Sequence, residues 1–276
     1  MSTGDWKITR YHSGREPKEL QDRVVVELPL EINVNGMPLV ALMRMPGMDK
    51  ELAVGFCLTE KIISDISQIR LLRHCGQMEE EIAQGGELAS DGLDRGNVVE
   101  IDVESPGDQE RFSGTFVVRT GCGGADLSAI EDYHEGMVSS QLEVSPQVIY
   151  GVGRELTSHQ EVFMGTGGTH GAGIFESDGR VVIVAEDVGR HNALDKAAGW
   201  CAMRCIRLED KILVLSGRVS YEMALKAVRV GIPVVVSMAA PTSLGLRIAE
   251  KAGLTLVGFS DGKRFNVYTH PERVGT

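Results

Sequence analysis

Three apolar runs in the second half of the chain are each followed by a segment with helical spacing. This alternation limits the folds open to the sequence, because it is typical of an α/β sheet with helices packed on its faces. The runs, each paired with the residue near which its helix is expected to begin, are 181–185 with Asn192, 212–215 with Tyr221 and 233–236 with Ser243. Two further runs, 254–259 and 265–268, flank an Asp261-Gly262 turn and predict a closing β-hairpin.

The first half of the chain has the pattern of strands rather than of alternating strands and helices. Apolar segments at 24–28 and 31–34 precede Asn35-Gly36, and another at 39–43 follows it. Asn-Gly between two apolar runs predicts a β-hairpin. Segments 97–103 and 112–118 are expected to return as strands.

Two helices complete the coarse outline. Asp49 is expected to cap a helix that runs through Leu52 and Phe56 to Ile63, and Pro146 is expected to begin a helix that ends near Leu156. Between the strands, residues 76–97 are rich in Glu, Gly and Asp and predict a flexible excursion. We place a domain boundary before residue 144, so that 1–143 is a mostly β domain and 144–276 an α/β domain.

Composition and charge narrow the classes of function. The chain of 276 residues has 28 Lys and Arg against 39 Asp and Glu, a formal charge of −11. Such an acidic protein is a poor match for non-specific binding to nucleic acid or anionic membranes. No apolar run reaches the ~20 residues of a membrane span, and the polar N-terminus lacks the apolar core of a signal peptide. Five cysteines without a framework spacing suit a reducing cytoplasm.

One thiol stands apart from the others. Cys122 lies in Gly121-Cys122-Gly123-Gly124, directly after an apolar run and Arg119. Glycines allow the backbone N–H groups to converge on one point, and such donors, together with a nearby arginine, favour a thiolate over a thiol. The alternative is a Gly-rich turn that happens to contain a cysteine. We interpret Cys122 as a reactive group.

The other cysteines have weaker contexts. Cys201 and Cys205 stand at i and i+4 on one helix, a spacing that can bind metal but that on an apolar helix more often belongs to the core. Cys57 lies in an apolar helix and is expected to be buried. Cys75 falls near a loop, where it could be exposed.

Polar residues gather where the predicted strands of the second half end. In an open α/β sheet, ligands bind beyond the carboxyl ends of the strands. A glycine-rich stretch, 163–173, precedes the first strand and permits close backbone approach to a ligand. The polar segments that follow the four strands are 186–192, 216–218, 240–243 and 259–264.

These segments contain the groups that a nucleotide requires. The cations that could face phosphates are Arg190, Arg218, Lys263 and Arg264. Asp187 or Asp261 could accept hydrogen bonds from a guanine edge. The alternatives are a strand-end salt bridge between Asp187 and Arg190, and a simple Asp-Gly turn at Asp261. His170 and His191 lie in the same predicted pocket as possible acid/base groups or ligand donors.

Five stretches of the sequence resemble a known family. They are Thr166–His170, Glu186–Lys196, Ser216–Met223, Ala240–Leu244 and Gly258–Tyr268, and they are similar to the formate dehydrogenase accessory sulfurtransferases of the FdhD/NarQ family. The Glu-Asp-Val-Gly-Arg-His-Asn segment that begins at Glu186 is long and distinctive. The resemblance covers nearly the whole chain and is strongest from about residue 112 onward.

The resemblance implies a fold, a reaction and partners. It implies a second domain like cytidine deaminase, a three-layer α/β/α arrangement, and a cytoplasmic homodimer. Family members take sulfur from a cysteine desulfurase as a cysteine persulfide and pass it to the molybdenum or tungsten bis-guanine-dinucleotide cofactor of formate dehydrogenase. Cys122 corresponds to the persulfide cysteine. The residues expected to bind this cofactor, molybdenum bis(molybdopterin guanine dinucleotide), are Phe259, Ser260, Asp261, Gly262, Lys263, Arg264, Thr166, Gly167, His170, Asp187, Arg190, His191 and Arg218.

One position departs from the family pattern. Many members carry Cys-x-x-Cys in the thiol loop, whereas here Ala125 takes the fourth position. One sulfur atom suffices to carry a persulfide, so Cys122 can still accept and donate sulfur. Ala125 removes a thiol that could resolve the persulfide into a disulfide.

Two other classes of function are alternatives for this sequence. A zinc nucleobase deaminase would need His-x-Glu or Cys-x-Glu together with Pro-Cys-x-x-Cys; His191-Asn192-Ala193 lacks the glutamate, and the second motif does not occur. A chaperone that binds the dinucleotide cofactor without sulfur chemistry is the other alternative, with Cys122 incidental.

Overall fold

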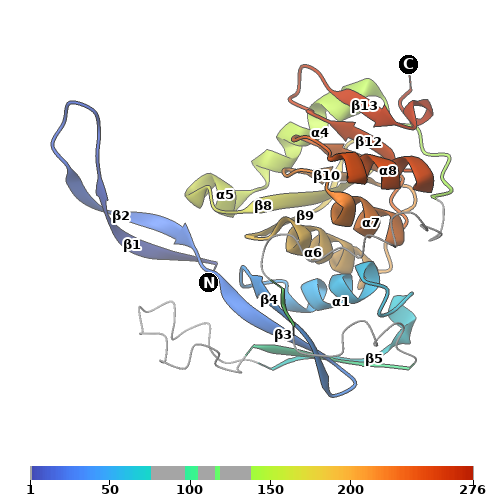
Figure 1. Ribbon diagram of the computed structural model, residues 1–276, viewed down its shortest axis with the longest axis horizontal. Coiled ribbons are helices and arrows are strands. Elements are labelled where there is room, and N and C mark those ends of the chain that lie inside the picture. The colour runs from blue at the N-terminus through green and yellow to red at the C-terminus, as the bar shows by residue number, and fades with distance from the viewer. Residues whose placement is uncertain (1, 76–96, 105–115, 119–137, 276) are drawn as a thin grey trace.

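The computed structural model describes residues 2–75, 97–104, 116–118 and 138–275. Its secondary structure consists mostly of strands in the first half of the chain and alternates between strands and helices in the second (Figure 1). The strands are β1 (Thr3–Arg10), β2 (Lys18–Val25), β3 (Leu28–Val34), β4 (Met37–Arg44), β5 (Ile69–Cys75), β6 (Val98–Val103), β7 (Phe116–Val118), β8 (His170–Phe175), β9 (Val181–Asp187), β10 (Ile212–Leu215), β11 (Val234–Ser237), β12 (Thr255–Gly258) and β13 (Asn266–Thr269). The helices are α1 (Asp49–Thr59), α4 (Pro146–Ser158), α5 (Glu161–Thr166), α6 (Arg190–Ala202), α7 (Tyr221–Arg229) and α8 (Ser243–Ala252), with short 3₁₀ helices at Ile66–Gln68 and Pro271–Arg273.

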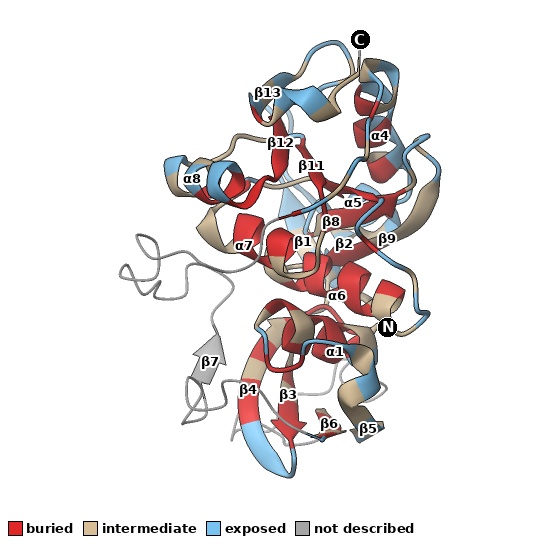
Figure 2. Cartoon of the chain, turned by 90° about the vertical axis from the view of Figure 1, so that its right-hand side faces the viewer, coloured by how far each residue is buried: buried red, intermediate tan, exposed pale blue. Residues whose placement is uncertain are grey.

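The second half of the chain forms a three-layer α/β/α unit around a six-stranded sheet. The strand order is β13-β12-β11-β10-β8-β9. One face packs on α4 through Ile149, Val152 and Leu156, and the other on α6, α7 and α8. Buried residues fill the sheet and the facing sides of these helices (Figure 2). The predicted alternation of strands and helices is thereby confirmed.

The first half adds a second sheet that α1 covers. Its strand order is β5-β6-β3-β4-β7, and its core includes Leu30, Ile32 and Val99 against Leu52 and Phe56 of α1. The predicted hairpin joins β3 to β4, with φ of 52° at Asn35 and 75° at Gly36. Two successive positive φ angles are what a two-residue hairpin turn of type I′ requires.

The remaining strands form a separate two-stranded ribbon. β1 and β2 pair antiparallel over their full length, from Thr3 opposite Val25 to Arg10 opposite Lys18. The ribbon projects from the body of the molecule (Figure 1), and β2 contacts α5. We call β1 and β2 together with their connecting turn, residues 3–25, the arm.

Several elements differ from the sequence prediction. The helix that begins at Asp49 ends at Thr59 rather than Ile63, and Met48 occupies its N-cap. The Asp49 carboxylate instead pairs with the buried guanidinium of Arg44 at 2.9 Å. The expected strand at 24–28 is not one strand, since β2 ends at Val25 and β3 begins at Leu28. Strands β1, β5, β8 and most of β2 were not predicted, because polar side chains interrupt β1, β2 and β5 and glycines are frequent in β8.

The fold class is confirmed as mixed α/β. The domain boundary before residue 144 remains a prediction, since α1 of the first half packs directly on α6 of the second (Figure 1). The predicted flexible excursion at 76–97 lies almost wholly outside the described residues, as does the Cys122 loop. Across the described ranges, no helix is long and apolar enough to span a membrane.

Two glycines let α1 and α6 meet at backbone distance. A Cβ added to Gly55 would lie 1.8 Å from the carbonyl oxygen of Asp195, and one added to Gly199 would lie 1.9 Å from that of Glu51. Both of these oxygens belong to the backbone, so neither can move aside as the end of a flexible side chain could. The contact between the two halves of the chain therefore depends on the absence of a side chain at both positions.

We expect Gly55→Ala to destabilise the protein by at least about 2 kcal/mol, because the added methyl group forces the two helix backbones apart. The measurement is the free energy of unfolding from urea denaturation. Gly151→Ala in α4 is the matched control, since a Cβ there meets no atom within 4 Å. It should leave stability unchanged or raise it by up to ~1 kcal/mol; an equal loss in both variants would contradict the steric explanation.

Candidate functional site

The carboxyl ends of four strands meet at one edge of the six-stranded sheet. β10, β11 and β12 are parallel, and β9 runs in the same direction as β10 because both are antiparallel to β8. β8 begins at this edge, with His170 opposite Asp187. Backbone hydrogen bonds link the loops beyond the strands to each other and to β8: Phe259 N donates to Ala239 O at 3.1 Å, and Ser216 N donates to Gly171 O of β8 at 3.0 Å. The predicted convergence of polar segments is confirmed.

A cationic notch lies where α6 and α7 begin, and we define it by His170, Arg190, Gly217 and Arg218. A Cβ on Gly217 would lie 3.3 Å from His170 Nδ1 and 3.5 Å from Arg190 Cδ, so the glycine keeps the notch open. Neither helix begins with a side-chain cap. Arg190 Nε and the Ser220 hydroxyl are buried without a hydrogen-bond partner among the described residues. Free donors and positive charge at two helix N-termini suit an anion.

The surroundings of His170 in the notch change the pKa of its imidazole ring. Burial lowers the pKa of His170 below its ordinary value, and the neighbouring charges of Arg190, His191 and Arg218 act in the same direction. The ring is therefore neutral at neutral pH when no anion is present. A bound anion would offset the surrounding positive charge and favour the protonated ring.

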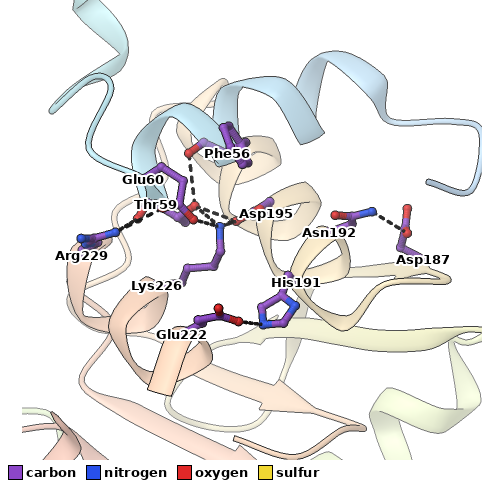
Figure 3. A network of polar contacts seen from close by, with 10 residues as sticks. All are labelled: Phe56, Thr59, Glu60, Asp187, His191, Asn192, Asp195, Glu222, Lys226 and Arg229. Atoms are coloured by element: carbon purple, nitrogen blue, oxygen red, sulfur yellow. Dashed lines mark hydrogen bonds and ion pairs between the residues drawn. The ribbon is translucent and has the colours of Figure 1, made fainter. Parts of the chain in front are cut away.

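His191 pairs with a carboxylate at the start of α7. Its Nε2 lies 3.0 Å from Glu222 Oε2 (Figure 3). This contact with His191 lowers the pKa of the Glu222 carboxyl below its ordinary value, against the opposing effect of burial. The sequence placed His191 in the pocket, and the structure gives its imidazole a carboxylate partner on the neighbouring helix.

Behind His191, a buried network of charges links α1 to α6 and α7 (Figure 3). The Lys226 ammonium contacts Asp195 at 2.9 Å, the Thr59 hydroxyl at 2.8 Å and Glu60 at 2.7 Å. Arg229 donates to the Thr59 carbonyl at 3.0 Å. Burial opposes the charge on Lys226, but the two carboxylates outweigh it and raise its pKa. Lys226 therefore remains an ammonium ion that ties the three helices together.

Asp187 is also part of the interior. It is fully buried, accepts from Met45 N at 3.1 Å and Asn192 Nδ2 at 3.0 Å, and pairs with Lys196 Nζ at 2.8 Å. This matches the alternative of a strand-end ion pair, with Lys196 rather than Arg190 as the cation. The carboxylate is enclosed by these partners and is not open to a guanine edge in this structure.

The turn from Phe259 to Arg264 mixes buried and exposed residues. Phe259 has a φ of 53° and leaves 42% of its surface exposed, whereas the hydroxyl of the buried Ser260 donates to Ile149 O at 3.1 Å. Asp261 accepts from the N–H groups of Lys263 and Arg264 at 2.9 and 3.0 Å, and these bonds lower its pKa. Asp261 thus forms the Asp-Gly turn, while the Lys263 and Arg264 side chains are exposed.

Thr166 and Gly167 end the short helix α5. Gly167 closes it with a φ of 67°, and the Thr166 hydroxyl donates to Val162 O and accepts from Gly168 N. Gly168 abuts Val25 of the arm, because a Cβ there would lie 2.8 Å from the valine side chain. Of the glycine-rich stretch, residues from His170 onward belong to β8 rather than to a loop.

The described thiols divide into two classes. Cys57 and Cys201 are buried, which raises the pKa of each to about 12. Cys75 and Cys205 are exposed, and Cys205 lies beyond the end of α6 rather than on it. Cys122, Arg119 and Ala125 lie outside the described residues. Within the described ranges, no group of three or more His, Cys, Asp or Glu side chains could hold a metal ion.

A cavity of about 770 Å³ lies at the other ends of α6 and α7. Ala202, Cys205, Val228 and Gly231 contribute to its wall together with Ile66. None of the predicted site residues lines it.

Comparison with known proteins places the chain in a family. The model of the FdhD/NarQ family matches residues 25–275, so the chain belongs to the FdhD/NarQ family. A protein of Sulfolobus acidocaldarius named "Sulfur carrier protein FdhD" is 38% identical over 272 residues, covering 97% of both chains. One of Mycolicibacterium paratuberculosis with the same name is 36% identical over 261 residues, covering 92% of each.

A solved structure has the same fold. It is a crystal structure from Desulfotalea psychrophila, provisionally described as a formate dehydrogenase accessory protein, with a TM-score of 0.75 and full coverage of both chains. Its sequence is 23% identical to this chain, and the likeness concerns the fold alone.

The sequence reasoning missed the residues that support the site. Asp195, Glu222 and Lys226 were not selected, although the first two lie inside the stretches that carry the family resemblance. One feature of the sequence could have indicated this network. Lys226 is a charged residue between the apolar residues Leu225 and Ala227 of a predicted helix. Its partners come from α1 and α6, which helical spacing within α7 does not reveal.

We expect Glu60→Gln to lower stability by about 1–3 kcal/mol at pH 7, because Lys226 and Arg229 lose a charged partner. Burial opposes ionisation of Glu60, but Lys226 outweighs it and the pKa falls below the ordinary 4.5. The carboxylate therefore contributes stability above pH 4.5 that is lost as the pH falls through the lower folded-state pKa. Urea denaturation of wild type and variant should converge in acid.

Glu104→Gln is the control for this prediction. Glu104 forms an exposed ion pair with Arg70 at 2.9 Å, and such pairs contribute ~0–1 kcal/mol. A Glu60→Gln effect as small as that of the control, or one that does not change between pH 7 and acid, would contradict a stabilising buried network.

Proposed function

We propose that this protein is a sulfur carrier that matures formate dehydrogenase. In the proposed reaction Cys122 accepts sulfur from a cysteine desulfurase as a persulfide. The sulfur then passes to the molybdenum or tungsten bis-guanine-dinucleotide cofactor, which is the substrate. The observation that carries the proposal is the near full-length similarity, at 36–38% identity, to proteins named "Sulfur carrier protein FdhD".

The first step is a thiol exchange at one sulfur atom. The Cys122 thiolate attacks the outer sulfur of the donor persulfide, forms a new S–S bond and expels the donor cysteine as a thiolate. No net oxidant is needed, because the sulfane sulfur is transferred between two cysteines. Arg119 and the flanking glycines favour the thiolate that this step requires.

The path of the chain supports delivery toward the carboxyl edge. β7 runs parallel to β4, with Val118 opposite Leu42. β4 leads to Met45, whose N–H bonds to Asp187 at the end of β9. Cys122 follows Val118 by four residues, a length that spans at most about 14 Å. The thiol thus starts from a strand that points toward the sheet edge carrying the notch.

The guanine-dinucleotide ends of the substrate suit the same edge. The notch offers Arg190 and Arg218 to phosphate oxygens, and the exposed Phe259 ring offers a stacking surface to a base. Four strand-to-strand steps separate β9 from β12, a distance of about 19 Å. An extended dinucleotide can therefore contact both places. The proposal also includes a cytoplasmic location and a homodimer.

We expect a Cys122→Ala protein to gain no sulfur. Wild type incubated with a cysteine desulfurase and cysteine should gain about 32 Da, the mass of one sulfur, in intact-mass spectrometry. The exposed Cys75 provides the matched control, because Cys75→Ala should retain the added mass and the ability to activate formate dehydrogenase. Sulfur uptake by Cys122→Ala at the wild-type yield would overturn the assignment.

The same variant distinguishes the chaperone alternative, which the missing second loop cysteine at Ala125 favours. If Cys122→Ala still matures formate dehydrogenase to the wild-type level, the protein delivers the cofactor without carrying its sulfur. If maturation is lost while cofactor binding persists, the sulfur carrier proposal stands.

We expect Arg190→Ala and Arg218→Ala each to weaken the binding of GDP by roughly tenfold or more, since each removes a charge-assisted contact to phosphate. Isothermal titration calorimetry measures the affinity. Arg180→Ala is the control, because Arg180 lies at the opposite end of β9 and pairs with Asp178. Equal affinities for all three variants would remove the notch from the proposed site.

A further inference from the structure

Helix α4 supports the turn 259–264 from the face of the sheet opposite α6 and α7. The hydroxyl of Ser260 in the turn donates to the Ile149 carbonyl of α4 at 3.1 Å. The rings of Tyr150 on α4 and Phe265 after the turn have their centroids 5.0 Å apart. These contacts attach the turn to α4, so side chains of α4 that lie near the turn belong to the same surface.

Arg154 of α4 lies directly beside this turn. A Cβ on Gly262 would lie 3.7 Å from Arg154 Nη2, and Gly262 has a φ of 84°. Arg154 is exposed, and among the residues that the structure describes it has no hydrogen-bond or ion-pair partner. Glu155, next to it on the helix, lies instead 3.8 Å from His159. The Arg154 guanidinium therefore has its donors available to a ligand at the turn.

Two further cations, Lys263 and Arg264, are exposed on the turn itself. The carboxylate of Asp261 is occupied within the turn, because it accepts from the N–H groups of these two residues and lies 3.4 Å from Arg264 Nε. With Arg154, the turn thus combines three cations with one carboxylate in a chain whose formal charge is −11. A local excess of positive charge on an acidic protein favours an anionic ligand at that place.

The first residue of the turn adds an exposed aromatic ring to these cations. Phe259 has a φ of 53°, in the left-handed region that residues with a side chain rarely adopt, and 42% of its surface is exposed. Backbone strain of this kind concentrates at functional sites. A nucleotide can stack its base on an aromatic ring and bind its phosphates to arginine, so the turn and Arg154 together suit this class of ligand.

We propose that Arg154, together with Lys263 and Arg264, binds the phosphates of one guanine-nucleotide end of the substrate, while the notch binds those of the other end. This inference rests on the function proposed above, in which the substrate carries two such ends and therefore needs two cationic subsites. Since α4 and the helices of the notch cover opposite faces of the sheet, the substrate crosses the carboxyl edge from one face to the other.

A fluorescent reporter tests this subsite separately from the notch. Phe259→Trp places an indole ring on the turn, and the wild-type chain, whose emission comes from Trp6 and Trp200, is the reference. GDP should change the emission of the Phe259→Trp protein more than that of the reference. Adding Arg154→Ala should raise the half-saturating GDP concentration by roughly tenfold or more, because a charge-assisted contact to phosphate is lost. Arg154→Lys keeps the charge without the bidentate fork, so its effect should be smaller.

Two controls locate the effect. Arg180→Ala in the same reporter protein removes a cation at the opposite end of β9 and should leave the half-saturating GDP concentration unchanged. Guanosine, which has no phosphate, should give the same response with and without Arg154→Ala. Arg154 and Arg180 are both exposed, so circular dichroism should confirm that the variants fold.

An unchanged half-saturating concentration in the Arg154→Ala reporter would overturn the proposal, as would GDP that binds in calorimetry without changing the emission of the reporter. An equal loss in the Arg180→Ala reporter would indicate a general effect of charge and would also overturn it. Failure of the sulfur carrier proposal is distinguishable, because the mass gained at Cys122 does not require GDP at the turn. GDP that binds nowhere on the protein would exclude both phosphate subsites and leave the sulfur uptake to be judged by mass alone.

Discussion

The architecture depends on the contact between α1 and α6. Gly55 and Gly199 allow the two helix backbones to touch, and the Lys226 ammonium fixes α1 to α6 and α7 from the side. A buried ammonium requires partners on all sides, so the network is satisfied only when the three helices are correctly placed. This contact holds the sheet of the first half, and with it the strand that leads to Cys122, against the unit that carries the notch.

The notch follows from the topology of the second sheet. Because β9 and β10 end at the same edge, the helices that follow them begin side by side and present their N-termini together. Gly217 leaves room there for Arg190 and His170. The His191–Glu222 pair and the Lys226 network lie on the same two helices, α6 and α7, so the site and the joint between the two halves share these helices.

The sequence predicted most of the second half, because short runs of β-branched residues, each followed by a segment with helical spacing, are compatible with few folds other than an α/β sheet. It did not predict the arm, whose strands carry alternating charges and few apolar residues, or β8, whose glycines suggested a loop. For the site, the sequence selected Arg190 and Arg218 as cofactor-binding residues, and this role remains a prediction for two residues that the structure sets in the notch. The sequence does not show that Met45 and Asn192 both donate hydrogen bonds to the Asp187 carboxylate.

By itself, the sequence determined the family, the mixed α/β class, the hairpin at Asn35-Gly36 and the polar strand ends, all of which depend on residues near one another in the chain. Tertiary structure alone decided which polar residues are buried and which are available. Asp187 is buried against Met45, 142 residues away, and Lys226 is buried against Thr59, 167 residues away. The Trp6 side chain, in contrast, is exposed to solvent. Burial depends on such contacts between residues that are distant in the sequence, and local sequence patterns cannot predict them.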